Sequence, residues 1–141
     1  LITPGASGAL LLIAALLVNP GDGMLMTDPG YPCNRHFMRL VEGCGQLVPV
    51  DASSNYQLNE DLIQAHWQEN TIGAMVASPA NPTGTALSRE ELTGLSGAVR
   101  SRNGYLLVVD HGSVLVCHLL AQQWLHWCRI SLHWFALASC W

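Results

Sequence analysis

Two kinds of hydrophobic pattern alternate along the first 110 residues, with turn residues between them. Stretches with helical spacing of apolar residues cover 7–18, 34–42, 59–68 and 88–100. Short, mostly apolar runs typical of buried strands cover 24–27, 46–50, 72–77 and 105–109. Strands that alternate with helices favour parallel pairing. The pattern therefore predicts an α/β domain with a mostly parallel sheet and helices on both faces.

Two of the predicted helices carry signals for their first residue. Asn59 stands where a side-chain oxygen can accept a hydrogen bond from the first turn. Ser88 and Glu91 have the spacing of a capping box, in which each side chain bonds the backbone N–H of the other residue. We expect helices to begin directly after Asn59 and Ser88.

The pattern changes abruptly after Asp110. The segment 111–141 has no acidic residue, its only formal charge is Arg129, and it holds four of the six histidines and four of the five tryptophans. Residues 119–137 have a spacing that permits a helix, but one apolar almost all round, which a small domain buries with difficulty. We therefore expect a domain over 1–110, followed by an apolar tail that comes from another gene segment or a shifted reading frame.

Composition and charge exclude several functions. The chain of 141 residues is long enough for one domain at most. Its net charge is −4 and its six basic residues, all arginine, form no stripe, which argues against nucleic-acid binding. The longest apolar run, 9–18, is too short for a bilayer, which needs about 20 residues. We expect no membrane partner. Because the chain begins with Leu1, we expect the true N-terminus to lie upstream.

The cysteines indicate a cellular compartment rather than a metal or disulfide site. There are five, none in a C-x-x-C pair, so neither a disulfide framework nor a structural zinc site is expected. Free thiols are typical of a reducing cytoplasm. Histidines 111, 118, 126 and 133 also lack ligand pairs three or four residues apart, and we expect no metal site.

The first segment with possible chemistry is Thr3-Pro4-Gly5-Ala6-Ser7-Gly8-Ala9, which stands before the first helix. Small residues let the backbone approach an anion, and the free N–H groups at a helix N-terminus favour phosphate. A purely structural glycine–serine turn is the alternative. The segment matches neither of the two common glycine-rich nucleotide motifs, which disfavours a nucleotide-binding domain.

Two proline-containing loops follow predicted strands, where ligands bind in open α/β sheets. In Asp28-Pro29-Gly30-Tyr31-Pro32, the tyrosine could stack on a planar ring or simply pack in a turn. In Ala77-Ser78-Pro79-Ala80-Asn81-Pro82-Thr83-Gly84, two prolines bracket Asn81, whose amide could hydrogen-bond a phenolate oxygen.

The fourth segment is the strand Tyr105-Leu106-Leu107-Val108-Val109-Asp110. An acid at the end of a buried strand is unfavourable without a cationic partner, and a protonated pyridine nitrogen would be such a partner. A helix cap or an ordinary salt bridge is the alternative.

In order and spacing, the four segments resemble the class I and II aminotransferases, which use pyridoxal 5'-phosphate (PLP) and have fold type I. The resemblance implies that residues 1–110 are part of the large cofactor-binding domain. It further implies that Ala6 and Ser7 hold the phosphate, Tyr31 stacks on the ring, Asn81 binds the phenolic oxygen and Asp110 pairs with the ring nitrogen. The implied reaction exchanges an amino group between an amino acid and a 2-oxo acid, in homodimers.

The chain departs from the family after Asp110. Ser113 stands where family members usually have a tyrosine, and the chain contains no lysine. The family's mechanism needs a lysine amine to bond the cofactor and to move a proton. We therefore expect no catalytic residue and no activity from this chain alone. The alternatives are a non-catalytic remnant, an interaction module that docks on a full-length relative, or a fragment of a fold-type-I lyase.

A shifted reading frame can be tested directly. Translating the encoding DNA in its other two frames after the Asp110 codon should yield a family-like continuation that includes the lysine motif. The hypothesis fails if neither frame yields one.

Overall fold

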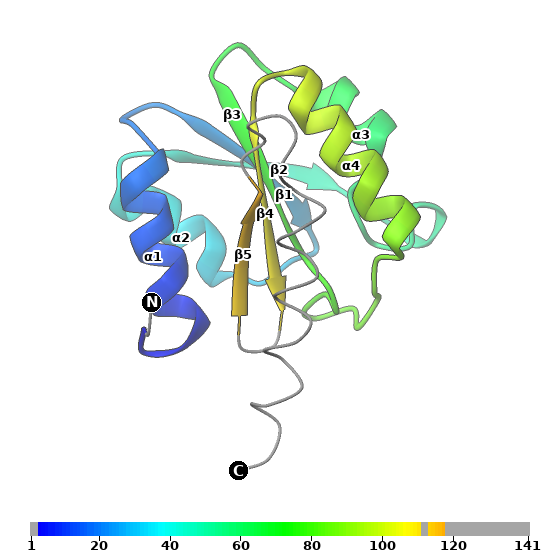
Figure 1. Ribbon diagram of the computed structural model, residues 1–141, viewed down its shortest axis with the longest axis horizontal. Helices are drawn as coiled ribbons and strands as arrows, with labels where there is room; N and C mark the ends of the chain where they lie inside the picture. The colour runs from blue at the N-terminus through cyan, green and yellow to red at the C-terminus, as the bar shows by residue number, and fades with distance from the viewer. Residues whose placement is uncertain (1–2, 111–112, 118–141) are drawn as a thin grey trace, which may run out of the picture.

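A five-stranded sheet forms the centre of the protein (Figure 1). The computed structural model describes residues 3–110 and 113–117. The strands are β1 (Gly23–Asp28), β2 (Cys44–Pro49), β3 (Thr71–Ala77), β4 (Tyr105–Asp110) and β5 (Ser113–Cys117). Their order across the sheet is β2-β1-β3-β4-β5. The first four are parallel, and β5 is antiparallel to β4.

Helices cover both faces of this sheet. Figure 1 shows α1 (Gly5–Leu17) and α2 (Cys33–Leu40) on one face and α3 (Glu60–His66) and α4 (Arg89–Ser101) on the other. A short 3-10 helix, η1 (Ala52–Ser54), lies between β2 and α3. The prediction of an α/β domain with a mostly parallel sheet and helices on both faces is confirmed.

Two hydrophobic cores lie on opposite faces because successive side chains of a strand point in opposite directions. In β1, Met24 and Met26 pack under α1 and α2, whereas Leu25 between them packs under α3 and α4. The core beneath α1 and α2 also contains Leu10, Ala14, Val18, Met38, Met75 and Leu107. The opposite core contains Val48, Val50, Leu58, Ile63, Ala74, Val76, Leu95, Ala98, Val99 and Leu106.

The predicted caps are confirmed. The Asn59 Oδ1 atom accepts a hydrogen bond from the Leu62 N–H at 2.9 Å. The Ser88 N–H donates to Glu91 Oε2 at 2.7 Å, and the Glu91 N–H donates to Ser88 Oγ at 3.2 Å. Hydrogen bonds from the backbone and the side chain of Ser88 lower the pKa of Glu91. The capping box therefore sets where α4 begins.

Two elements were not predicted from the sequence, η1 and β5. The β5 strand pairs with the edge of β4 from Leu106 opposite Cys117 to Asp110 opposite Ser113. An edge strand offers unpaired N–H and C=O groups to any neighbouring extended segment, so local sequence does not reveal such pairing. The helix expected over 119–137 lies outside the described residues. Within the described part of the chain, no helix is both long and apolar enough to cross a membrane.

Close packing of β3 on β4 depends on Gly73. Gly73 pairs with Tyr105, and a Cβ atom at position 73 would collide with the Tyr105 backbone oxygen. No side chain can therefore be added there without moving one strand.

Replacing Ser88 with alanine should lower the free energy of unfolding by about 1 kcal/mol, because α4 loses its side-chain cap. Urea denaturation at neutral pH measures this change. Ser96→Ala, inside α4, is the matched control and should change stability little. Equal losses in the two variants would contradict the role of the cap.

Gly73→Ala should destabilise the protein by about 1–3 kcal/mol, because the added methyl group forces strand β3 away from β4. Gly97→Ala provides the contrast. Gly97 lies on α4 with open space around its Cβ position, so alanine there should stabilise the protein by about 0.5–1 kcal/mol. Thermal and urea unfolding report both changes. A Gly73→Ala variant as stable as the parent would show that the β3–β4 spacing can adjust.

Candidate functional site

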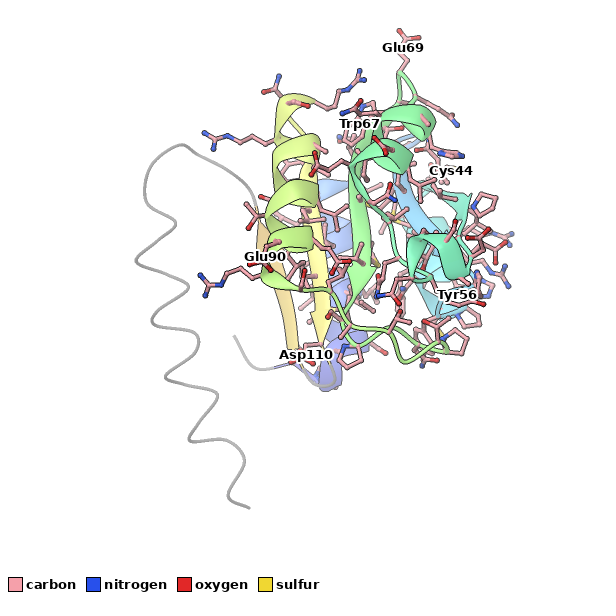
Figure 2. The ribbon with its side chains drawn as sticks, turned by 90° about the vertical axis from the view of Figure 1, so that its right-hand side faces the viewer. Cys44, Tyr56, Trp67, Glu69, Glu90 and Asp110 are labelled. Atoms are coloured by element: carbon pink, nitrogen blue, oxygen red, sulfur yellow. The ribbon has the colours of Figure 1, made fainter. Side chains whose placement is uncertain are left out.

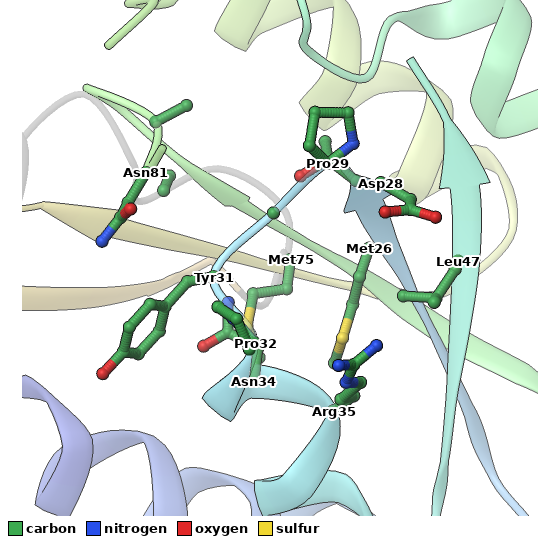
Figure 3. A pocket seen from close by; sticks show the side chains of 14 residues that line it. Met26, Asp28, Pro29, Tyr31, Pro32, Asn34, Arg35, Leu47, Met75 and Asn81 are labelled. Atoms are coloured by element: carbon green, nitrogen blue, oxygen red, sulfur yellow. The ribbon is translucent and has the colours of Figure 1, made fainter. Parts of the chain in front are cut away.

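A cavity of about 200 Å³ lies where β1 and β3 end. The two strands are neighbours in the sheet, so the loops that leave their carboxyl ends meet at one edge. Figure 3 shows the Tyr31 ring and the Asn81 amide on the same side of this cavity. The lining consists of Met26, Thr27, Asp28, Pro29, Gly30, Tyr31, Pro32, Asn34, Arg35, Leu47, Met75, Ala77, Ala80 and Asn81.

The loop that carries Tyr31 is held close to the end of β1. Its Gly30 lies so near the chain that a Cβ atom there would collide with the backbone oxygen of Thr27. The Val50 N–H donates to the Asp28 carbonyl at 2.9 Å, which ties the loop to the end of β2. The Tyr31 side chain is 39% exposed, so one part of its ring is open to a ligand. A side-chain hydrogen bond with Cys33 raises the pKa of Tyr31.

The loop that carries Asn81 is closed by its own backbone. The Ala80 N–H donates to the Thr85 carbonyl at 2.8 Å, and the Gly84 N–H donates to the Ala80 carbonyl at 2.7 Å. Gly84 has a φ of 73°, a left-handed conformation that favours glycine. The Ser78 N–H donates to the Val109 carbonyl at 2.9 Å and so joins the loop to β4. The Asn81 side chain is exposed to solvent at the tip of this stiff loop.

Ala6 and Ser7 lie in the first turn of α1. The residue that caps α1 is Pro4, which supplies no side-chain hydrogen bond, and the first turn has no acidic residue. The Gly5 N–H donates to the Thr3 carbonyl at 2.7 Å, whereas the N–H groups of Ala6 and Ser7 have no side-chain cap and keep their capacity to bind an anion. Ala6 and Ser7 do not line the cavity, but Figure 1 shows that α1 begins at the edge of the sheet where β4 ends.

Asp110 is the last residue of β4 and also lies at this edge. Figure 2 shows it at the opposite end of the sheet from Trp67 and Glu69, which precede β3. Its side chain is exposed, so burial by itself does not require a cationic partner, and the predicted pairing of Asp110 with a ring nitrogen stays a prediction. The carboxylate stands at the edge of the sheet without the desolvation cost of a buried acid.

The structure thus brings two of the five predicted site residues, Tyr31 and Asn81, to one cavity. Ala6, Ser7 and Asp110 lie at the same edge of the sheet, outside the lining of that cavity. Sequence reasoning missed the lining residues Asn34 and Arg35, which lie in the first turn of α2, directly after the Tyr31 loop. Their position in the sequence, directly after the Tyr31 loop, was a signal that could have identified them. The Asn34 Oδ1 atom is buried and has no hydrogen-bond partner.

Within residues 3–110 and 113–117, no group of three or more histidine, cysteine or acidic side chains could hold a metal ion. Cys33 and Cys44 are free thiols. Histidines 111, 118, 126 and 133 of the tail lie outside the described residues.

Comparison with known proteins identifies relatives for most of the chain. A model of the family described as aminotransferase class I and II matches residues 1–111. Valine–pyruvate aminotransferase of Mycobacterium tuberculosis is 36% identical over 96 residues, which are 67% of this chain and 24% of that protein. 1-Aminocyclopropane-1-carboxylate synthase 1 of Prunus mume is 32% identical over 111 residues, covering 73% of this chain and 22% of the synthase.

The fold gives the same result. A crystal structure of an aminotransferase from Mycobacterium tuberculosis superposes with a TM-score of 0.70 and 30% identity, over 75% of this chain and 29% of that one. The chain spans about a quarter of the length of the curated relatives it matches. The chain therefore belongs to the class I and II aminotransferases, a family of PLP-dependent enzymes of fold type I.

Proposed function

We propose that this chain forms part of the PLP-binding site of an aminotransferase, with the cofactor ring against Tyr31 and its phenolic oxygen beside Asn81. The observation that carries this proposal is that Tyr31 and Asn81, which are far apart in the sequence, line one cavity at the carboxyl edge of the sheet. Ligands of open α/β folds bind at this edge.

The chemistry of the available groups fits PLP. Tyr31 offers a partly exposed aromatic face for a planar ring, and Asn81 offers amide N–H groups for a phenolic oxygen. Ala6 and Ser7 offer N–H groups without a side-chain cap for the phosphate. The cavity of about 200 Å³ is smaller than the usual ~300–1,000 Å³ of ligand sites. It would therefore hold part of the cofactor, and Ala6 and Ser7, which lie outside its lining, would hold the phosphate.

When bound, PLP supplies an electron sink that makes the α-proton of an amino acid easier to remove. The residues of this chain would bind and orient that group. Asp110 would hold a proton on the ring nitrogen, and Tyr31 would exclude water from one face of the ring. In an intact relative, we expect the substrates to be an amino acid and a 2-oxo acid and the assembly to be a homodimer.

We further propose that this chain transfers no amino group alone. It contains no lysine, so no side-chain amine can bond the cofactor or move the α-proton. The alternatives to a cofactor-binding role are a cofactor-free remnant and a module that docks on a full-length relative. A relative of the chain is named a synthase and not an aminotransferase, so a second candidate is a fold-type-I enzyme of another reaction class, such as a lyase.

Titration of the purified chain with PLP, followed by absorbance and fluorescence, should show weak, non-covalent binding. Tyr31→Ala should weaken that binding about three- to tenfold, because the stacking ring is lost. Tyr31→Phe is the matched control, since it keeps the ring and removes only the hydroxyl. Asn81→Ala should also weaken binding, by the loss of one hydrogen bond.

Three outcomes would contradict these proposals. Absence of PLP binding would contradict the proposed cofactor site and favour a cofactor-free remnant. Borohydride should fix no adduct on a side chain, and an adduct elsewhere than on the terminal amine would contradict the binding mode. Transaminase turnover by the chain alone would refute its inactivity.

A further inference from the structure

We propose that Gln57 is a positioning residue that clamps the two ends of the Asn81 loop, residues 78–84. This inference rests on the proposed function, because Asn81 is the residue that Gln57 would position for the cofactor. Gln57 comes from the connection between η1 and α3, far from Asn81 in the sequence, and is only 1% exposed.

The hydrogen bonds of the Gln57 side chain reach both ends of the loop. Its Nε2 atom donates to the Ala77 carbonyl at 3.0 Å and to the Thr85 carbonyl at 3.0 Å, and lies 3.3 Å from Thr85 Oγ1. Ala77 ends β3, and Thr85 follows the loop. An amide nitrogen carries two N–H donors, which matches the two carbonyl acceptors. One side chain thus joins the start of the loop to its end.

The two carbonyl acceptors determine which end of the Gln57 amide faces the loop. Carbonyl oxygens only accept hydrogen bonds, so the nitrogen of Gln57 has to face Ala77 and Thr85. The Oε1 atom of the same amide is buried and has no partner. Burial of an unpaired acceptor is unfavourable. The hydrogen bonds from Nε2 to the loop therefore stabilise this orientation by more than the unpaired Oε1 atom destabilises it.

The backbone around Gln57 is also held. The Gln57 N–H donates to the Ser54 carbonyl at 3.0 Å, and the Tyr56 N–H donates to the Asp51 carbonyl at 2.8 Å. Asn55 and Tyr56 have φ values of 54° and 52°. These two consecutive left-handed residues turn the chain after η1, just before Gln57. Backbone hydrogen bonds therefore hold the turn from which the Gln57 side chain extends.

Gln57 would affect the position of Asn81 through the Thr85 carbonyl, which accepts hydrogen bonds from Gln57 and from the loop backbone. The Thr85 carbonyl accepts from both Gln57 and the Ala80 N–H, and the Ala80 carbonyl accepts from the Gly84 N–H. Without the N–H groups of Gln57, the links to the Ala77 and Thr85 carbonyls are lost, and the loop is held by its own backbone hydrogen bonds with fewer restraints at both ends. Asn81, exposed at its tip, would then sample more orientations, and a ligand that needs one of them would bind less tightly.

Gln46 provides a matched control. It is also a buried glutamine, 9% exposed, whose Nε2 atom donates to Gln68 Oε1 at 3.2 Å and Asn70 Oδ1 at 3.0 Å. These partners lie before β3, at the edge of the sheet away from the loop. Loss of its hydrogen bonds should affect general stability without a specific effect on residues 78–84.

The experiment compares the full chain with its variants Gln57→Met and Gln46→Met. Amide hydrogen exchange of Ala80 and Gly84 is measured relative to Met75 inside β3. Methionine keeps the bulk of the side chain without its donors, so Gln57→Met should accelerate exchange at both loop positions about tenfold relative to Met75. In the parent chain, both side-chain N–H protons of Gln57 should exchange more slowly than those of the exposed Asn81 side chain, because they donate to backbone carbonyls. Gln46→Met should leave the ratio unchanged.

Cofactor affinity is the second measurement. Gln57→Met should weaken PLP binding about tenfold, whereas Gln46→Met should not. If the parent chain does not bind PLP but Gln57→Met still loosens the loop, the proposed function fails and the clamp stands.

Unchanged exchange at Ala80 and Gly84 in Gln57→Met, or the same acceleration in Gln46→Met, would overturn the clamp. If Gln57→Met does not fold, the exchange of the Gln57 side-chain N–H protons in the parent chain decides. Exchange slower than that of the Asn81 side chain supports donation as the function of this position, and exchange as fast as that of Asn81 refutes it.

Discussion

Parallel pairing of β1, β3 and β4 is the constraint on which the rest of the molecule depends. Met26 of β1 pairs with Met75 of β3, and Ala77 of β3 pairs with Val109 of β4, so the three strands end at one edge of the sheet. The Tyr31 loop, the Asn81 loop and Asp110 all leave from that edge. A short turn joins the end of α1 to the start of β1, so the helix runs in the opposite direction to the strand. The first turn of α1 therefore lies at the same edge, where β1 ends.

Parallel pairing brings the loops together but does not make them stiff. Each loop is stiffened by contacts of its own. Gly30 lets the Tyr31 loop lie against the backbone of Thr27, and the Asn81 loop is closed by its own hydrogen bonds and by the Gln57 amide. A site built on such loops keeps a defined geometry because a rigid sheet supports it.

Much of the local structure could be predicted from the sequence. Short apolar runs predicted the four parallel strands, and the Ser88–Glu91 spacing predicted the start of α4, because these features depend on neighbouring residues. Tyr31 and Asn81 could be chosen as candidates because prolines and glycine mark their loops. The contacts of Gln57 could not be foreseen, because nothing around position 57 indicates that its amide meets Ala77 and Thr85.

The sequence by itself determined the periodicity of the elements, the caps, the stiff loops and the absence of a lysine amine. Only the tertiary structure decided the order β2-β1-β3-β4-β5, the pairing of β5 with β4, the exposure of Asp110 and the meeting of Tyr31 with Asn81 at one cavity. The physical reason is the range of the interactions. Caps and turns form between residues a few positions apart, whereas strand order and burial depend on contacts between segments that are distant along the chain.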